Sequence, residues 1–318
     1  MKRFSLFLLA LTALSLGATA QRLAGSSLRG DVNEDGTVNG SDINMLIDIV
    51  LGKYVTPPGN ATETYTVNGV KFTMVRVEHG SFAMGATAEQ ASYANDDERP
   101  AHQVTLTKDY YIGQTEVTQA LWQAVMGNNP SYFNGYGNSS AGSGHSSTSY
   151  GTNLQRPVEY VSWNDCQTFI TKLNALTGRT FRLPTEAEWE FAARGGNLSQ
   201  RYKYAGSNTL GDVAWYWDNI PSQSSGNAGY GTQTVATKSP NELGLYDMSG
   251  NVYEWCQDWY GSYSSGAQTV PTGPTSGSYR VYRGGSWGTF ASFCRVSSRY
   301  YWYADCTFDD LGLRLALQ

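Results

Sequence analysis

The sequence predicts an α+β protein in which short strands and three short helices are joined by much ordered loop, preceded by a small loop–helix appendage. Glycine (35 residues) punctuates the alternating apolar and polar runs that are typical of strands, so short strands are expected. Aromatic residues make up 13% of the chain and charged residues 15%. Because disordered chains lack aromatic residues, this composition indicates a loop-rich folded globule.

Residues 1–20 have the layout of a secretion signal. Lys2 and Arg3 precede the apolar run 4–16, and a small-residue cleavage site ends at Ala20. The run is too short to cross a bilayer as a helix, and no later stretch is apolar enough to span a membrane. We therefore predict cleavage near Ala20 and a mature protein that is secreted or held at the cell surface or in the periplasm.

Residues 28–53 predict the appendage, an EF-hand-like calcium loop followed by a helix. Oxygen-bearing residues stand at the spacing that such a loop requires, and Gly36 permits its sharp turn. The expected ligands are Asp31, Asn33, Asp35, Thr37, Asn39 and Asp42. The segment resembles one repeat of a dockerin, which implies a cohesin-like partner. Dockerins carry two repeats and this chain has one, so a calcium-stapled spacer is the alternative.

A linker is predicted over residues 54–64, and the large domain over residues 65–318. Strand-like alternation covers 65–67, 70–75, 80–85 and 100–106. The first helix follows the capping residue Thr118 and ends at Gly127. The second helix ends at Gly178 and faces inward with Cys166, Phe169, Ile170, Leu173 and Leu176. The third helix begins with a capping box of Thr185 and Glu188.

Few residues of the large domain suggest catalysis by themselves. His102 lies near Glu98 in the sequence, but no nucleophile or metal ligand accompanies them, so a hydrogen-bonded loop histidine is the better interpretation. Glu186 and Glu190 lack a partner group and are interpreted as residues of a helix start. The four cysteines could form up to two disulfides in an oxidising compartment.

The net charge of −5 comes without any basic run. Nucleic acids and anionic membrane surfaces attract clusters of Lys and Arg, so both are excluded as expected partners.

Linked motifs along the large domain resemble the formylglycine-generating enzyme (sulfatase-modifying factor) family. They are FAMG (82–85), TEVT (115–118), PVEYVSW (157–163), RLPTEAEWE (182–190), GLYDMSGNVYEW (244–255) and RGGSW (283–287). The resemblance covers nearly all of 65–318. It implies that family's C-type-lectin-like fold, with little regular secondary structure.

The resemblance also implies a calcium site around the segment 247–254. In the family, side-chain and carbonyl oxygens bind the ion, and the matching residues here are Asp247, Gly250, Val252 and Glu254. Hard oxygen ligands of this kind suit calcium. A calcium-free turn, in which backbone amides bind Glu254, is the alternative.

The family's copper(I) site fits this chain less well. Formylglycine generators hold the ion between two cysteines five residues apart, and the matching positions here are Thr289 and Cys294. A hydroxyl cannot replace a thiolate as a ligand of this soft ion, and Cys306 lies outside the motif. Copper and the oxidase reaction are therefore not expected, and Cys294 would be catalytic only if the chain were such an enzyme.

The C-terminal stretch resembles the variable proteins of diversity-generating retroelements. Those proteins hold rewritten positions on a fixed framework, here Arg283 to Trp287, Arg295, Arg299 and 312–315. Most residues at 289–293 and 300–308 can arise by adenine-directed mutagenesis of an asparagine codon, although Trp302 cannot. An invariant aromatic surface is the alternative. The expected ligand-binding residues are Trp287, Thr289, Phe290, Ser292, Phe293, Tyr300, Tyr301, Trp302, Tyr303, Asp305, Phe308 and Asp309.

The sequence thus predicts an exported protein that binds a protein or glycan ligand through its C-terminal surface. Two alternatives remain: an oxidase that generates formylglycine in sulfatases, and a scaffold component that docks through its calcium repeat.

Overall fold

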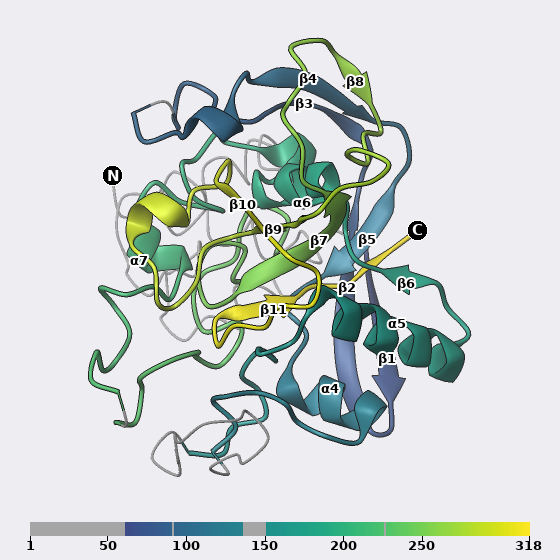
Figure 1. The fold of residues 1–318 in the computed structure, drawn as a ribbon, viewed down its shortest axis with the longest axis vertical. Helices are drawn as coiled ribbons and strands as arrows, with labels where there is room; N and C mark the ends of the chain where they lie inside the picture. Colours follow the sequence, from purple (N-terminus) through teal and green to yellow (C-terminus); the bar gives the residue numbers. More distant parts are fainter. Residues whose placement is uncertain (1–60, 91, 136–150, 226) are drawn as a thin grey trace, which may run out of the picture. The chain divides into compact units, whose positions relative to one another are not determined.

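The computed structural model describes residues 61–90, 92–135, 151–225 and 227–318 (Figure 1). Contacts divide the chain into the units Met1–Gly59 and Asn60–Gln318. The predicted signal, calcium loop and most of the linker lie outside the described residues. Within the described ranges, no helix combines the length and hydrophobicity that a membrane crossing requires.

A five-stranded sheet runs in the order β1-β2-β5-β12-β6. Its strands are β1 (Thr62–Val67), β2 (Val70–Val77), β5 (Tyr110–Gly113), β12 (Ala316–Leu317) and β6 (Phe181–Arg182). Asn68 and Gly69 join β1 to β2 with φ of 47° and 84°, as a tight hairpin turn requires. The first strand begins three residues before the predicted domain boundary at Tyr65.

Two smaller sheets complete the strand architecture. The four-stranded sheet has the order β10-β9-β7-β11, with β10 at Arg299–Trp302, β9 at Arg280–Arg283, β7 at Tyr253–Trp259 and β11 at Leu311–Leu313. The three-stranded sheet contains β3 (Gly80–Met84), β4 (His102–Leu106) and β8 (Gln268–Thr269). Strand β11 runs parallel to β7, and β8 runs parallel to β4. The other strand pairs are antiparallel.

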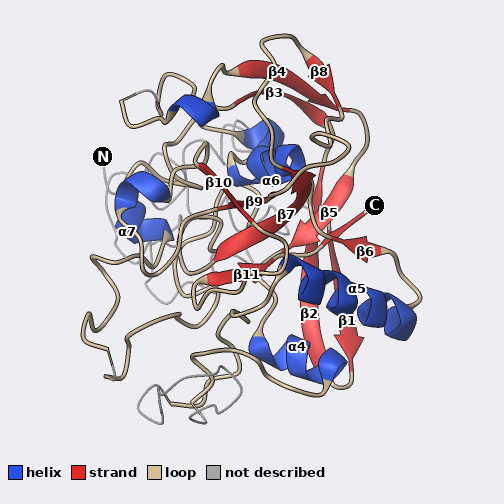
Figure 2. Ribbon diagram, in the orientation of Figure 1, coloured by secondary structure: helices blue, strands red, loops and turns tan. Residues whose placement is uncertain are grey.

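Three helices lie where the sequence predicts them: α4 (Gln119–Met126), α5 (Trp163–Thr177) and α6 (Glu186–Ala193). Thr118 accepts a hydrogen bond at the start of α4, and the predicted capping box begins α6. Figure 2 shows α4 and α5 beside β1 and β2, whereas α6 packs against β7 and β9. Short helical turns occur at α7 (Leu210–Val213), η1 (Asp96–Glu98), η3 (Gly196–Leu198) and η4 (Ala291–Phe293).

Three features differ from the sequence-based expectations: the exposure of Leu176, the state of the cysteines, and the roles of Glu186 and Glu190. Leu176 is 53% exposed because the last turn of α5 extends beyond the core. All four cysteines are free thiols, and Cys166, Cys256 and Cys294 are buried in separate hydrophobic clusters. His102 is hydrogen-bonded as expected, with its Nδ1 3.1 Å from the Pro100 carbonyl oxygen and no pairing with Glu98, although it lies in β4 rather than in a loop. Glu186 and Glu190 are buried partners of arginines rather than helix caps.

Candidate functional site

Buried ion pairs fix the C-terminal stretch to the core. We call its four buried arginines the anchor arginines: Arg283, Arg295, Arg299 and Arg314. Arg283 binds Glu190. Between nitrogen and oxygen, Arg295 binds Glu98 at 2.7 Å, Arg299 binds Glu186 at 2.6 Å, and Arg314 binds Glu254 at 2.7 Å. Arg295 and Arg299 each bind both oxygens of their carboxylate, and this bidentate geometry makes the two pairs directional. The backbone between the anchors is therefore held in a defined position.

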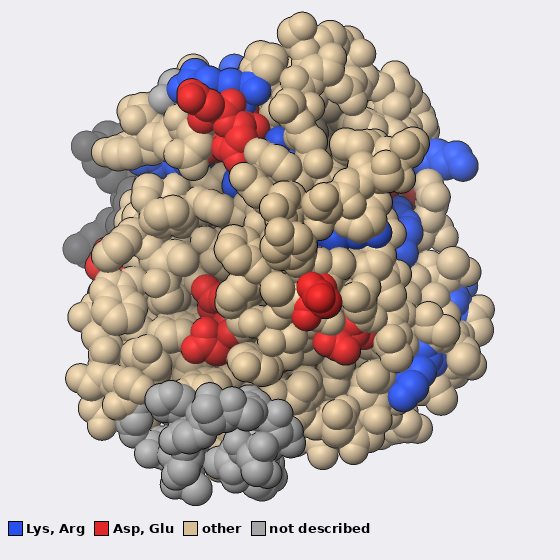
Figure 3. Space-filling view, in the orientation of Figure 1, with Lys and Arg blue, Asp and Glu red and all other residues tan. Residues whose placement is uncertain are grey.

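Between these anchors the chain turns aromatic side chains to solvent. We call six of them the aromatic face, and their exposed fractions range from 36% to 58%: Phe290, Phe293, Tyr301, Trp302, Tyr303 and Phe308. Figure 1 shows the yellow C-terminal segment crossing the middle of the view. On the same side, Figure 3 shows Lys and Arg mainly at the top and toward the right, and separate Asp and Glu groups near the middle of a mostly uncharged surface. Contact with a ligand here would rest on aromatic rings more than on charge.

Most of the other predicted contact residues are less exposed. Trp287 is 4% exposed, packs against Phe133 at 5.2 Å between ring centroids, and donates from Nε1 to the Asp309 carbonyl. It supports the surface from below and does not form part of it. Tyr300 is partly buried against Tyr253. Of the remainder, Asp305 is exposed, whereas Thr289, Ser292 and Asp309 are partly buried.

Two tyrosines outside the C-terminal stretch extend the aromatic face. Tyr260 stacks on Tyr301 with ring centroids 3.7 Å apart. Tyr279 contacts Tyr303 at 4.7 Å, and their hydroxyl oxygens are 3.3 Å apart. Sequence reasoning missed both tyrosines, because nothing in their local pattern distinguishes them from the other 20 tyrosines of the chain.

Thr289 and Cys294 lie together at the position of the family's cysteine pair. The Thr289 Oγ1 atom is 3.7 Å from the Cys294 Sγ atom. That hydroxyl accepts from the Ser286 amide and donates to the Ser286 carbonyl, both at 3.0 Å. Burial raises the pKa of the Cys294 thiol to about 12. One protonated thiol and one hydroxyl do not fit copper(I), which binds soft thiolate ligands.

Unpartnered carboxylate oxygens lie at the expected calcium segment. Asp247 accepts from the Ala236 amide through Oδ2, but its buried Oδ1 has no partner. Both oxygens of the buried Glu116 are also unpartnered. Burial raises the pKa of Asp247 to about 6. Burial is also the main cause that raises the pKa of Glu116, and the charge of Asp247 is the second. Carboxylates without hydrogen-bond partners fit a calcium ion, which binds hard oxygens.

Glu254 has a different environment from these two carboxylates. It accepts hydrogen bonds from Arg314 at 2.7 Å and from the Trp189 indole at 2.6 Å. Backbone amides are thus not what binds it. Over the described residues, no three His, Cys, Asp or Glu side chains are grouped as a metal site requires. Any calcium here would depend on Asp247, Glu116 and carbonyl oxygens before Glu254.

Comparisons with known proteins address the scaffold. Residues 62–318 match the sulfatase-modifying factor enzyme 1-like domain. The chain is 32% identical over 316 residues to chaperone protein LppX of Paenibacillus barcinonensis, covering 86% of this chain and 97% of that protein. It is 32% identical over 302 residues to the formylglycine-generating enzyme of Streptomyces coelicolor, covering 81% of this chain and 92% of the enzyme.

Solved structures agree with this assignment. Treponema denticola variable protein 1 superimposes with a TM-score of 0.66 at 36% identity, over 81% of this chain and 99% of that one. PvdO from Pseudomonas aeruginosa gives 0.62 at 25% identity, over 83% and 100%. The predicted C-type-lectin-like fold with little regular secondary structure is confirmed. The chain belongs to the formylglycine-generating enzyme (sulfatase-modifying factor) family.

Proposed function

We propose that this protein binds a protein or glycan ligand through the aromatic face and does not oxidise a substrate cysteine. The observation that carries the proposal is the alternation of anchor arginines with exposed rings along one stretch of chain. Tyrosine and tryptophan provide large contact areas at a low cost in conformational entropy, and a rigid backbone lowers that cost further.

The environment of Thr289 supports binding over catalysis. Its hydroxyl takes part in two hydrogen bonds with the Ser286 backbone, so the position is built for a threonine rather than for a metal ligand. The rival proposal is direct oxidation. Incubation with copper(I), oxygen and a sulfatase-type cysteine peptide should leave the peptide unchanged, and formation of formylglycine would overturn the binding proposal.

We also propose that the exposed positions are diversified. The similarity to Treponema denticola variable protein 1, at 36% identity, supports this idea. Resequencing of the gene from many sibling isolates should give substitutions clustered at 289–293 and 300–308, with the anchor arginines unchanged. An invariant C-terminal stretch would remove the diversification proposal but not the binding proposal.

Serine substitution of the aromatic face should abolish binding without unfolding the protein. Ligands selected from a displayed random-peptide library and a glycan array serve as probes. A Y301S/W302S/F308S variant should bind them at least about a hundredfold more weakly, because central aromatic anchors each contribute roughly 2 kcal/mol or more. Calorimetry gives the affinity, and thermal unfolding checks the fold.

A matched control removes exposed apolar side chains elsewhere. Tyr93, Leu198 and Val270 are 59%, 39% and 45% exposed and lie outside the aromatic face. A Y93S/L198S/V270S variant should keep full affinity. Equal loss in both variants, or no loss in either, contradicts a binding role of the aromatic face.

We propose calcium as a structural ion held by Asp247 and Glu116 together with the carbonyl oxygens of Gly250 and Val252. Calcium should raise the unfolding temperature relative to EGTA, because a ligand present at 100 times its Kd stabilises by about 2.7 kcal/mol. Glu116→Gln should reduce this shift. Glu242→Gln, at a partly buried carboxylate elsewhere in the fold, should keep it. An undiminished shift in Glu116→Gln argues against Glu116 as a ligand.

The predicted calcium loop of the appendage could contribute to the same shift. A D31N/D35N variant of the full chain separates the two contributions, since it leaves Asp247 and Glu116 intact. The same variant tests the docking alternative: a cohesin-like partner recovered by wild type and lost by this variant would support a scaffold role.

A further inference from the structure

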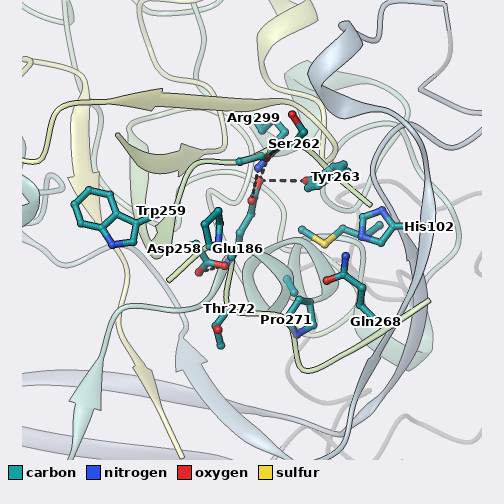
Figure 4. A pocket seen from close by; sticks show the side chains of 15 residues that line it. His102, Glu186, Asp258, Trp259, Ser262, Tyr263, Gln268, Pro271, Thr272 and Arg299 are labelled. Atoms are coloured by element: carbon teal, nitrogen blue, oxygen red, sulfur yellow. Dashed lines mark hydrogen bonds and ion pairs between the residues drawn. The ribbon is translucent and has the colours of Figure 1, made fainter. Parts of the chain in front are cut away.

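A cavity lies apart from Thr289 and Cys294, between the start of α6, the end of β7 and the loop after β8 (Figure 4). Its volume is about 290 Å³, at the lower end for small-molecule sites. Its polar lining comes from Glu186, Asp258, Tyr263, Arg299, His102 and Gln268. Apolar walls are supplied by side chains such as Met84, Trp259 and Pro271.

Two of the charged groups in this lining neutralise each other. Arg299 binds both oxygens of Glu186, with Nε–Oε1 and Nη2–Oε2 distances of 2.7 and 2.6 Å. Tyr263 donates its hydroxyl to the same carboxylate at 3.1 Å, as the dashed lines in Figure 4 show. The remaining guanidinium nitrogen of Arg299, Nη1, donates to the carbonyls of Asp97 and Gly261, so no donor group of this arginine binds Asp258.

Asp258 is the carboxylate that remains without a counterion. It is 4% exposed, and its Oδ2 accepts the Glu186 backbone amide at 2.9 Å. Its Oδ1 accepts no hydrogen bond, and it forms no ion pair, among the residues that the structure describes. Arg280 is another nearby cation, but its guanidinium lies between the rings of Trp163 and Trp259, 3.7 and 3.5 Å from their centroids.

We propose that this cavity binds a small organic cation, an alkylammonium compound, whose charged group is held by Asp258. A buried carboxylate with a free oxygen attracts an ammonium donor, since an uncompensated charge is costly in a low-dielectric site. Gln268 and His102 offer further polar contacts on the opposite wall, and the apolar walls suit the alkyl part. This site is independent of the aromatic face.

Binding should depend on pH in a defined direction. Burial, followed by the charge of Glu186, raises the pKa of Asp258 to about 8. The other charged or titratable groups near it are Glu188 on α6, Arg299 on β10, Arg280 on β9, Cys256 on its own strand and His102 in the lining. Below pH 8 the ammonium must displace a proton, so its affinity should fall about tenfold per pH unit.

The test compares butylammonium and putrescine with butan-1-ol, a neutral compound of similar size, by calorimetry at pH 7 and at about pH 9. We expect the two ammonium compounds to bind and to bind about tenfold more tightly at the higher pH. Asp258→Asn keeps an oxygen for the Glu186 amide but removes the charge, and should weaken binding at least about tenfold. Asp305→Asn makes the same change at an exposed carboxylate and should have no effect.

Three outcomes would overturn the proposal: equal affinity for butan-1-ol, unchanged affinity in a folded Asp258→Asn variant, or no binding of either ammonium compound at about 10 mM and the higher pH. If Asp258→Asn does not fold, the comparison of charged and neutral compounds on wild type still decides the matter.

Discussion

Thr289→Cys should give the protein a copper(I) site with two thiol ligands, where wild type is expected to bind copper(I) only weakly. The threonine oxygen is 3.7 Å from the Cys294 sulfur. With metal–thiolate bonds of about 2.3 Å, two sulfurs on one ion can lie up to about 4.6 Å apart, so a cysteine at 289 is within reach. We expect the variant to bind copper(I) at least about a hundredfold more tightly than wild type, measured by competition with a chromogenic chelator.

The affinity of this variant should also rise with pH. Burial raises the pKa of Cys294 to about 12 in the parent chain, so metal binding must release the proton of that thiol. Thr289→Ser is the matched control, because it keeps a hydroxyl and should bind no more copper than wild type. Tight copper binding by wild type itself would contradict our interpretation of this position. Loss of the two Thr289 hydrogen bonds should cost the cysteine variant about 1 kcal/mol each in stability.

Arg295→Met should destabilise the fold by about 3–5 kcal/mol, because it leaves the fully buried Glu98 without its counterion. Arg295 binds both oxygens of Glu98 at 2.7 Å, and Ser297 donates to the same carboxylate at 2.6 Å. Chemical denaturation of wild type and variant measures the difference. Arg179→Met is the control: its ion pair with Glu63 spans 3.9 Å between side chains 54% and 39% exposed, and should contribute less than about 1 kcal/mol.

The difference in the free energy of unfolding between Arg295→Met and wild type should decrease at acidic pH. Desolvation opposes ionisation of Glu98, but hydrogen bonds from Arg295 and Ser297 outweigh it and lower the pKa of that carboxyl. A group with a lowered folded pKa stabilises above its unfolded pKa, about 4.3 for Glu, and loses this contribution as the pH falls through the folded pKa. The Arg295→Met variant lacks this stabilising contribution. If the difference in the free energy of unfolding between wild type and variant stays constant below about pH 4, the Arg295–Glu98 pair is not its source.

Local signals in the sequence predict the helices well. Thr118, Gly127 and the Thr185–Glu188 capping box determine where helices begin and end, and each effect acts within a few residues. The linked motifs predict the fold class, which the comparisons confirm.

Pairings between distant segments could not be predicted. Glu98 and Arg295 are 197 residues apart, and Glu186 and Arg299 are 113 apart, so no local pattern connects them. The sequence therefore favoured a helix-start role for Glu186, although the tertiary structure uses it as a counterion. The burial of Trp287 could not be predicted for the same reason, since its partner Phe133 comes from a distant part of the chain.

The position of β12 affects when the protein can fold. Ala316 and Leu317 pair with β5 on one side and with β6 on the other, so this two-residue strand joins the two parts of the five-stranded sheet. The sheet cannot close until Leu317 has left the ribosome, and contacts across such long sequence separations form slowly. The five-stranded sheet is therefore completed only after Leu317 has been synthesised, although the β1–β2 hairpin does not depend on β12.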